Sequence, residues 1–190
     1  MPELRDPRPG TNAPRGRALR RRGGSSRPPF AVKVLVVGVG NPGRRDDGLG
    51  GALVDRINVE KKGGQAPISR EIGACPLSIK AEWKCQLNIE DAQAVQDADL
   101  VVFADATTEG EEPATLEEIA PAAQIAVTTH AMAPASVLAL AEELYGRAPK
   151  AYLLAIRGYD FDIGETLSPQ AAANLESALS LFSEFLLSLK

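Results

Sequence analysis

The sequence predicts an α/β fold, a three-layer α/β/α sandwich, from two observations. Short, nearly uninterrupted apolar runs recur along the chain, and stretches with helical spacing of apolar residues separate them. Apolar runs bounded by glycine or polar residues are typical of strands that are buried on both faces of a parallel sheet. Strands that alternate with helices build a sheet covered by helices on both faces. We therefore expect a mostly parallel sheet between two helical layers.

The first strand is expected at Val32 to Val37, which is apolar apart from Lys33. A glycine-rich turn, residues 38 to 50, follows it and contains the adjacent pair Asp46 and Asp47. A helix should begin after this turn, because apolar residues then recur at the spacing of one helix face: Leu49, Leu53 and Ile57. Ligands of open α/β sheets bind outside the carboxyl ends of the strands, so the two carboxylates stand where a site is expected.

The remaining elements follow from the same patterns. Pro134 and Gly146 are suited to start and end one helix, and Ser168 with Pro169 is suited to start the last one. The stretch from residue 73 to residue 86 shows no clear periodicity. Further strands are predicted at Ile68 to Ile72, Leu100 to Ala104, Ile125 to Val127 and Ala151 to Ile156, and further helices from Asn88 through Val95, at Thr115 to Ile119, from Pro134, and from Ser168 to the end.

The first thirty residues differ in composition from the rest. They hold eight arginines and six prolines against two acidic residues, a net charge of +6, which leaves −10 on residues 31 to 190. Such a segment cannot bury enough apolar surface to offset the entropy of ordering, so we expect a disordered basic tail. The tail could contact nucleic acid or an acidic partner, although a solvated extension is the simpler interpretation. Residues 31 to 190 are expected to form one α/β domain, and we expect deletion of residues 1 to 28 to leave its activity intact.

No stretch has the pattern of a secretory signal or of a membrane span, so a cytoplasmic protein without a membrane partner is expected. We also expect a monomer that has no nucleic-acid partner. Cys75 and Cys85 are the only cysteines. Their spacing suggests neither a disulfide scaffold nor a zinc site, and we interpret them as reduced thiols.

Three candidate groups follow predicted strands: the Asp46 and Asp47 pair, Asp105, and His130, which is the only histidine. If the strands are parallel neighbours, these side chains meet at one edge of the sheet. Two carboxylates and an imidazole suit a divalent transition-metal ion. Each also has a simpler explanation, since an aspartate can cap a helix or form a turn, and a histidine can be a hydrogen-bonded core residue.

A dinucleotide site is the first alternative, because Gly38, Gly40 and Gly43 match the pattern G-x-G-x-x-G. The motif alone is weak evidence. Asp46 and Asp47 would repel a pyrophosphate at the helix start, where the helix dipole should attract it. The sequence therefore argues against this alternative.

Three segments together resemble the hydrogenase maturation endopeptidases, which trim the C-terminal extension of the large subunit of nickel–iron hydrogenases. They read GVGNPGRRDDGLG at residues 38 to 50, DLVVFADA at residues 99 to 106, and THAMAPASVLALAEELYG at residues 129 to 146. The segment RGYDFDIGETLSP and a closing helix follow in the order that the family shows. The resemblance implies a twisted, five-stranded mixed sheet in which one strand is antiparallel.

The resemblance also implies the roles of individual residues. Asp47, Asp105 and His130 would be the catalytic, metal-binding set, with Asp46 in support of it or capping the helix. The metal would be nickel supplied by the substrate, a hydrogenase large-subunit precursor, which the enzyme would recognise once nickel is inserted. The nickel could then polarise the scissile carbonyl or activate a water, with one aspartate as base.

One departure and two alternatives accompany the resemblance. Many family members carry Asp-Gly-Gly after the second strand. This chain instead reads EIGACPLS, at residues 71 to 78, where that turn is expected. Peptidyl-tRNA hydrolases share the GNPG turn, but they continue with a histidine that residues 44 to 48 lack, and an acidic domain suits tRNA poorly. The second alternative is a non-catalytic assembly chaperone that senses nickel.

Overall fold

The computed structural model describes residues 31–63, 77–122 and 132–189. The basic tail, Cys75, the strands expected at Ile68 to Ile72 and Ile125 to Val127, and His130 lie outside these residues.

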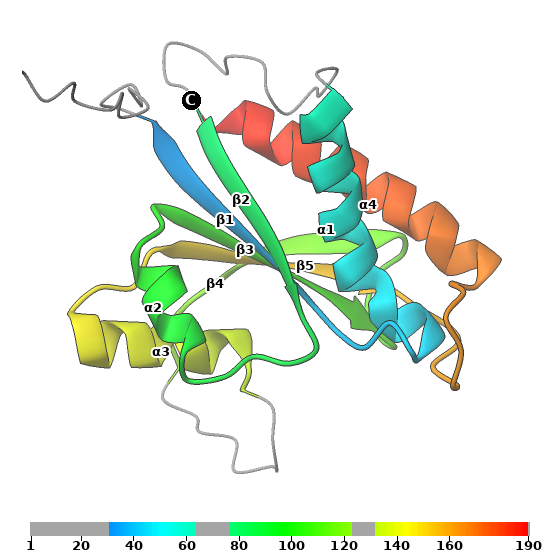
Figure 1. Cartoon of the computed structure of the whole chain (residues 1–190), viewed down its shortest axis with the longest axis horizontal. Coiled ribbons are helices and arrows are strands. Elements are labelled where there is room, and N and C mark those ends of the chain that lie inside the picture. The colour runs from blue at the N-terminus through cyan, green and yellow to red at the C-terminus, as the bar shows by residue number, and fades with distance from the viewer. Residues whose placement is uncertain (1–30, 64–76, 123–131, 190) are drawn as a thin grey trace, which may run out of the picture.

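The centre of the molecule is a five-stranded sheet with the order β2-β1-β3-β5-β4 (Figure 1). Four strands run parallel, and only β4 pairs antiparallel with its neighbour β5. This arrangement confirms the expected mixed, mostly parallel sheet. The strands are β1 (Val32–Val39), β2 (Leu77–Lys84), β3 (Leu100–Thr107), β4 (Ala114–Ile119) and β5 (Lys150–Arg157).

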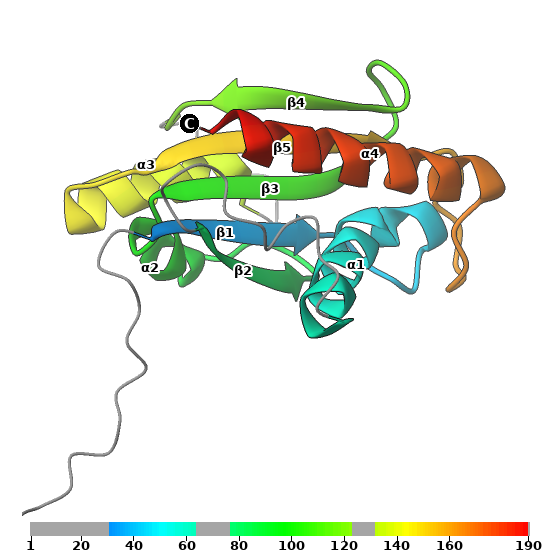
Figure 2. The same cartoon turned by 90° about the horizontal axis from the view of Figure 1, so that it is seen from above.

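Helices cover both faces of the sheet, which confirms the three-layer sandwich. Figures 1 and 2 show α1 and α4 on one face and α2 and α3 on the other. Each pair closes its own apolar core against alternate residues of the strands, because successive strand side chains point to opposite faces. The helical elements are the short 3-10 helix η1 (Arg45–Gly48), α1 (Leu49–Gly63), α2 (Asp91–Gln96), α3 (Pro134–Tyr145) and α4 (Pro169–Ser188). No helix in the described part of the chain is both long and apolar enough to cross a bilayer.

The predicted boundaries of the last two helices are confirmed by their capping residues, whereas the helix predicted from Asn88 begins only at Asp91. Ser168 is the N-cap of α4, and its hydroxyl oxygen accepts a hydrogen bond from the backbone N–H of Ala171 at 3.2 Å. Gly146 ends α3 with a φ of 71°, a left-handed conformation that glycine adopts at little cost.

The prediction of a helix at Thr115 to Ile119 is wrong, because this segment belongs to the edge strand β4. Leu116 packs against the core beneath α1 and α4, whereas Ile119 packs against the core beneath α2 and α3. That period of two fits a strand, and pairing with β5 overrides the helical propensity of a Leu-Glu-Glu-Ile segment.

The strand β2 was not predicted from the sequence. β2 lies in the stretch without clear periodicity, and its alternation is visible only in the partly buried positions Leu77, Ile79 and Ala81, which face α1 and α4. As an edge strand it also carries the charged residues Lys80, Glu82 and Lys84, which obscured the pattern.

Candidate functional site

Asp47 and Asp105 lie together at the carboxyl edge of the sheet. β1 and β3 are parallel neighbours, with Gly38 opposite Ala104 in the register. Asp105 directly follows Ala104, and Asp47 is carried by η1, the first element after β1. By strand alternation Asp105 points to the same face as Phe103, the face that α2 and α3 cover.

Close backbone packing holds η1 and the start of α1 against the ends of both strands. A β-carbon at Gly50 would overlap the carbonyl oxygens of Val39 and Ala104, so only glycine allows α1 to begin there. Gly40 has a φ of 128°, and a side chain on it would collide with the Asp47 carbonyl group. The Asp47 carboxylate accepts a hydrogen bond from the backbone N–H of Asn41 at 3.1 Å. Gly40, one of the glycines that suggested a dinucleotide site, thus allows the close packing that positions an acid.

The environment of Asp105 raises the pKa of its carboxyl group to about 6. Burial is the largest cause, since it disfavours the charged form. A hydrogen bond from the backbone N–H of Ala106, at 2.8 Å, partly opposes this effect. The negative charge of Asp47 raises the pKa further, so the two carboxylates interact electrically. Such a pair can hold a proton near neutral pH or bind a cation that removes the repulsion.

Asp46, the neighbour of Asp47, is fully buried and accepts four hydrogen bonds. The donors are the backbone N–H groups of Tyr159, Asp160 and Ser168, at 2.8, 2.9 and 2.7 Å, and the Ser168 hydroxyl at 2.8 Å. Burial would raise the pKa of Asp46, but these hydrogen bonds outweigh it, so the pKa lies below its ordinary value. All four bonds go to the loop after β5, so Asp46 supports the turn that carries Asp47 instead of capping α1.

The loop of residues 158 to 168, named here the clamp loop, also binds the two arginines of the first motif. The Arg44 guanidinium donates two hydrogen bonds to the Phe161 carbonyl oxygen, at 3.2 and 3.0 Å. Arg45 forms an ion pair with Asp160 at 2.9 Å, and its backbone N–H donates to the Gly164 carbonyl at 2.7 Å. Sequence reasoning missed this role of the loop. The only signal was a polar, acidic loop directly after a buried strand.

The third predicted site residue, His130, lies outside the described residues, so its position relative to the two acids stays a prediction. Among residues 31–63, 77–122 and 132–189, no group of three histidine, cysteine or acidic side chains has the arrangement of a metal site. The described structure thus brings two of the three expected residues together.

Comparison with known proteins gives matches in structure and none in sequence. No family model matches the chain, and no curated protein matches it in sequence. The solved structures that it resembles include the [NiFe] hydrogenase maturation protease HycI from Thermococcus kodakarensis, with 22% identity and a TM-score of 0.54 over 82% of this chain and 92% of that one.

Two further structures give the same result. The hydrogenase maturating endopeptidase HybD from E. coli has 22% identity and a TM-score of 0.55, over 80% of this chain and 90% of that one. A hydrogenase 2 maturation peptidase from a Thaumarchaeota archaeon has 20% identity and a TM-score of 0.54, over 83% and 99%. The sheet, its one antiparallel strand and these matches agree with the fold that the motifs implied. The chain therefore has the fold of the hydrogenase maturation proteases.

Proposed function

We propose that this protein is an endopeptidase that removes the C-terminal extension of a nickel–iron hydrogenase large-subunit precursor after nickel insertion. The observation that carries the proposal is the pairing of Asp47 and Asp105 at the carboxyl edge, in a fold that the named proteases share. Both acids were singled out from the sequence motifs before their proximity was known. The cytoplasm, where a precursor would be assembled, is the proposed location.

The substrate would carry the metal, and the protein would supply side chains that recognise it. Carboxylates and an imidazole suit a divalent transition ion, and the mutual repulsion of the acid pair would favour cation binding. Asp47, Asp105 and His130 are the proposed docking groups for the substrate's nickel. Binding there would orient the scissile bond only in precursor that has received its metal.

The described chain next to His130 supports including the histidine. The backbone N–H of Met132 donates to the Leu87 carbonyl at 3.2 Å, in the loop that follows β2. Met132 also packs against the core beneath α2 and α3, the face to which Asp105 points. Met132 follows His130 by two residues, a chain length of at most about 7 Å, and this short separation supports including the histidine in the proposed set.

Asp105 is suited to the proton transfer that peptide hydrolysis requires. A general base works best when its pKa is close to the working pH, and the pKa of about 6 brings Asp105 nearer to neutrality than an ordinary aspartate. In this proposal Asp105 takes a proton from the attacking water, while Asp47 holds the cation.

The test is the cleavage of nickel-loaded and nickel-free precursor by the wild type and by Asp47→Asn, Asp105→Asn and His130→Ala. Each variant should lower cleavage of loaded precursor by at least about a hundredfold, as removal of a catalytic group commonly does. Asp97→Asn is the matched control, because this exposed carboxylate precedes β3 at the opposite edge of the sheet. Circular dichroism would verify that every variant is folded.

Three outcomes would contradict the proposal. Normal cleavage by any of the three variants would remove that residue from the set. Equal cleavage of nickel-free precursor would remove the metal-sensing step. Intact precursor with the wild type, despite binding, would favour the non-catalytic chaperone. The net charge of −10 on residues 31 to 190 argues against the tRNA-directed alternative.

A further inference from the structure

Arg157, the last residue of β5, lies at the same edge of the sheet as the acid pair. β3 and β5 are parallel neighbours, in which Asp105 is opposite Ala155 and Thr107 is opposite Arg157. Because strand side chains alternate, Arg157 leaves the strand on the same face as Asp105. Adjacent strands lie about 4.8 Å apart and each residue rises about 3.3 Å, so the two Cα atoms are about 8 Å apart. One peptide group of a substrate can therefore reach both side chains.

The guanidinium of Arg157 forms no ion pair or hydrogen bond within the described part of the chain. Its Nε atom is shielded from solvent and has no acceptor among residues 31–63, 77–122 and 132–189. Asp105 does not use its charge either, because a bound guanidinium would lower the pKa of that carboxyl group, whereas the pKa is raised to about 6. A shielded donor without an acceptor is unfavourable, and an incoming acceptor would relieve that cost.

The aromatic ring of Tyr159 holds the guanidinium in place. The guanidinium carbon of Arg157 lies 5.8 Å from the centroid of that ring, within the range of a cation–π interaction. Asn174 of α4, which is buried, donates to the Tyr159 hydroxyl oxygen at 3.0 Å and to the Arg157 carbonyl oxygen at 2.9 Å. These contacts fix both the ring and the backbone of the arginine, so the guanidinium is positioned before a substrate binds.

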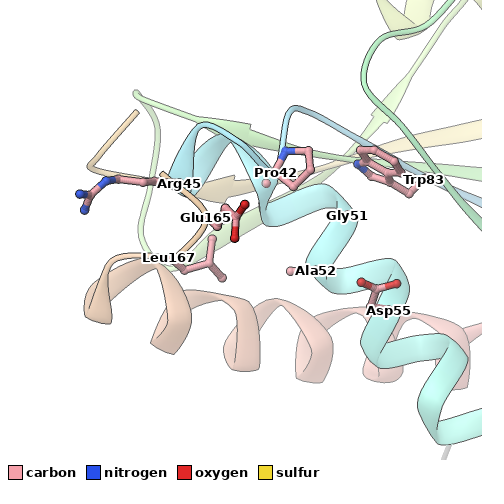
Figure 3. Close-up of a pocket in the computed structure, with 9 residues that line it drawn as sticks. Pro42, Arg45, Gly51, Ala52, Asp55, Trp83, Glu165 and Leu167 are labelled. Atoms are coloured by element: carbon pink, nitrogen blue, oxygen red, sulfur yellow. The ribbon is translucent and has the colours of Figure 1, made fainter. Parts of the chain in front are cut away.

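The other cationic side chains described at this edge are already bonded. The Arg44 guanidinium donates to the clamp loop, and the Lys84 ammonium pairs with Asp91 at 2.7 Å. The Nε atom of Arg45 also lacks an acceptor, but its guanidinium forms the ion pair with the clamp loop, and Figure 3 shows this side chain extending away from α1. Among the described residues of this edge, Arg157 is thus the cation whose guanidinium can accept an anionic ligand.

We propose that Arg157 is a catalytic residue that binds the oxyanion formed when the scissile peptide bond is attacked. The proposal rests on the proposed function, because it adds a residue to that reaction. Attack of water on the carbonyl carbon forms a C–O bond, moves the carbonyl electron pair onto its oxygen and passes a water proton to Asp105. The negative oxygen accepts hydrogen bonds from the guanidinium. When the C–N bond breaks, the electron pair returns to the carbonyl, and the leaving amine takes the proton from Asp105.

The acid pair makes such a cation necessary. Negative charge that develops on the carbonyl oxygen is repelled by the nearby carboxylates. In the proposed function the cation held by Asp47 offsets the charge of the acid pair, and Arg157 offsets the charge that appears during the reaction. A donor placed for charge that exists only in the transition state raises kcat and leaves substrate binding nearly unchanged.

Cleavage of nickel-loaded precursor tests this role. Arg157→Ala should lower kcat by about a hundredfold to a thousandfold and change KM by less than about threefold, because the interaction forms only in the transition state. Arg157→Lys keeps the charge without the paired donors and should lose only about tenfold. Added guanidinium chloride should restore part of the kcat of Arg157→Ala. The matched control is Arg147→Ala, because this arginine precedes β5 at the opposite edge, where it pairs with Asp99, and kcat should stay unchanged.

Two kinetic results would overturn the proposal. The first is a kcat of Arg157→Ala within about threefold of the wild type, which would mean that the guanidinium does not contact the reacting oxygen. The second is a loss of kcat in a folded variant that neither lysine nor added guanidinium restores, because that loss would mark a structural role. Circular dichroism verifies the folding of each variant.

A second experiment measures anion binding without any precursor. Dimethylphosphinate is a tetrahedral anion, as the proposed oxyanion is, and dimethyl sulfone is its uncharged counterpart of the same shape. NMR of the whole chain follows the Nε–H signal of Arg157, which is identified by its loss in Arg157→Lys. The phosphinate should shift this signal saturably, and the sulfone should bind at least about tenfold more weakly. An equal response to both compounds, or no response to the phosphinate, would overturn the proposal.

The two experiments separate this proposal from the proposed function. If no form of the protein cleaves nickel-loaded precursor, the proposed function fails. The phosphinate result still decides whether Arg157 binds a tetrahedral anion at this edge of the sheet.

Discussion

Asp46 and Asp105 are both withdrawn from water at the same edge of the sheet, yet their surroundings act in opposite directions. Asp46 accepts four hydrogen bonds from the clamp loop, and its pKa is lowered. Asp105 accepts one bond from its own neighbour, faces a second carboxylate, and has a pKa raised to about 6. The difference separates a carboxylate that maintains the structure from one that stores unfavourable electrostatic energy. Such energy is available for binding a cation or a proton.

The largest expected effect is on stability, at Asp46. Asp46→Ala should lower the free energy of unfolding by about 3 kcal/mol, because it leaves several buried donors without an acceptor. Urea denaturation at neutral pH measures the change. The wild type should lose this stabilisation in acid, once the pH falls below the ordinary pKa of 3.8 and through the lower pKa of folded Asp46. An unchanged midpoint would mean that the hydrogen bonds add nothing.

Substitution of Asp105 is expected to raise the free energy of unfolding, whereas substitution of Asp46 lowers it. Asp105→Asn should raise the free energy of unfolding at about pH 7 by about 1 to 2 kcal/mol, because the folded state no longer holds a buried charge. The gain should shrink towards about pH 4, since the wild-type folded state is protonated below a pKa of about 6, whereas the unfolded chain stays ionised down to about 3.8. Urea denaturation at both pH values checks this. A destabilised variant would refute the contrast with Asp46.

A smaller effect, from a substitution of Asp47, would separate the two causes that raise the pKa of Asp105, which are burial and the charge of Asp47. Asp47→Asn should lower the pKa of Asp105 from about 6, because it removes a neighbouring negative charge. The pKa should stay above 3.8, since burial is the larger cause. Carboxyl carbon chemical shifts, followed against pH by NMR, give the value directly. An unaltered pKa would show that the two acids are too far apart to act as a pair.

The smallest effect is expected at the surface of the clamp loop. Asp160→Asn removes the ion pair with Arg45. The side chain of Arg45 is 41% exposed and that of Asp160 is 35% exposed. Pairs that water can reach contribute at most about 1 kcal/mol, so the free energy of unfolding should change by less than that. A loss as large as that of Asp46→Ala would mean that the loop depends on its arginines as much as on Asp46.

The sequence predicted those parts of the fold and the site that depend on local signals. A few neighbouring residues were enough to predict the apolar strands β1, β3 and β5 and the helix ends at Ser168 and Gly146. β4 and β2 were missed because edge strands depend on pairing with a distant neighbour, which overrides local propensity. The likeness to the protease motifs gave Asp47 and Asp105, but no local pattern revealed that Asp46 bonds to residues more than a hundred positions away.

The hydrogen bond between Ser168 and Asp46 joins residues 122 positions apart. During synthesis the turn that carries Asp47 leaves the ribosome long before its partner exists. The acid pair can therefore reach its final geometry only when the last helix is being made, and contacts of such long range form late and slowly. A ribosome-stalled or C-terminally shortened chain that ends before residue 159 should contain most of the sheet and no competent site.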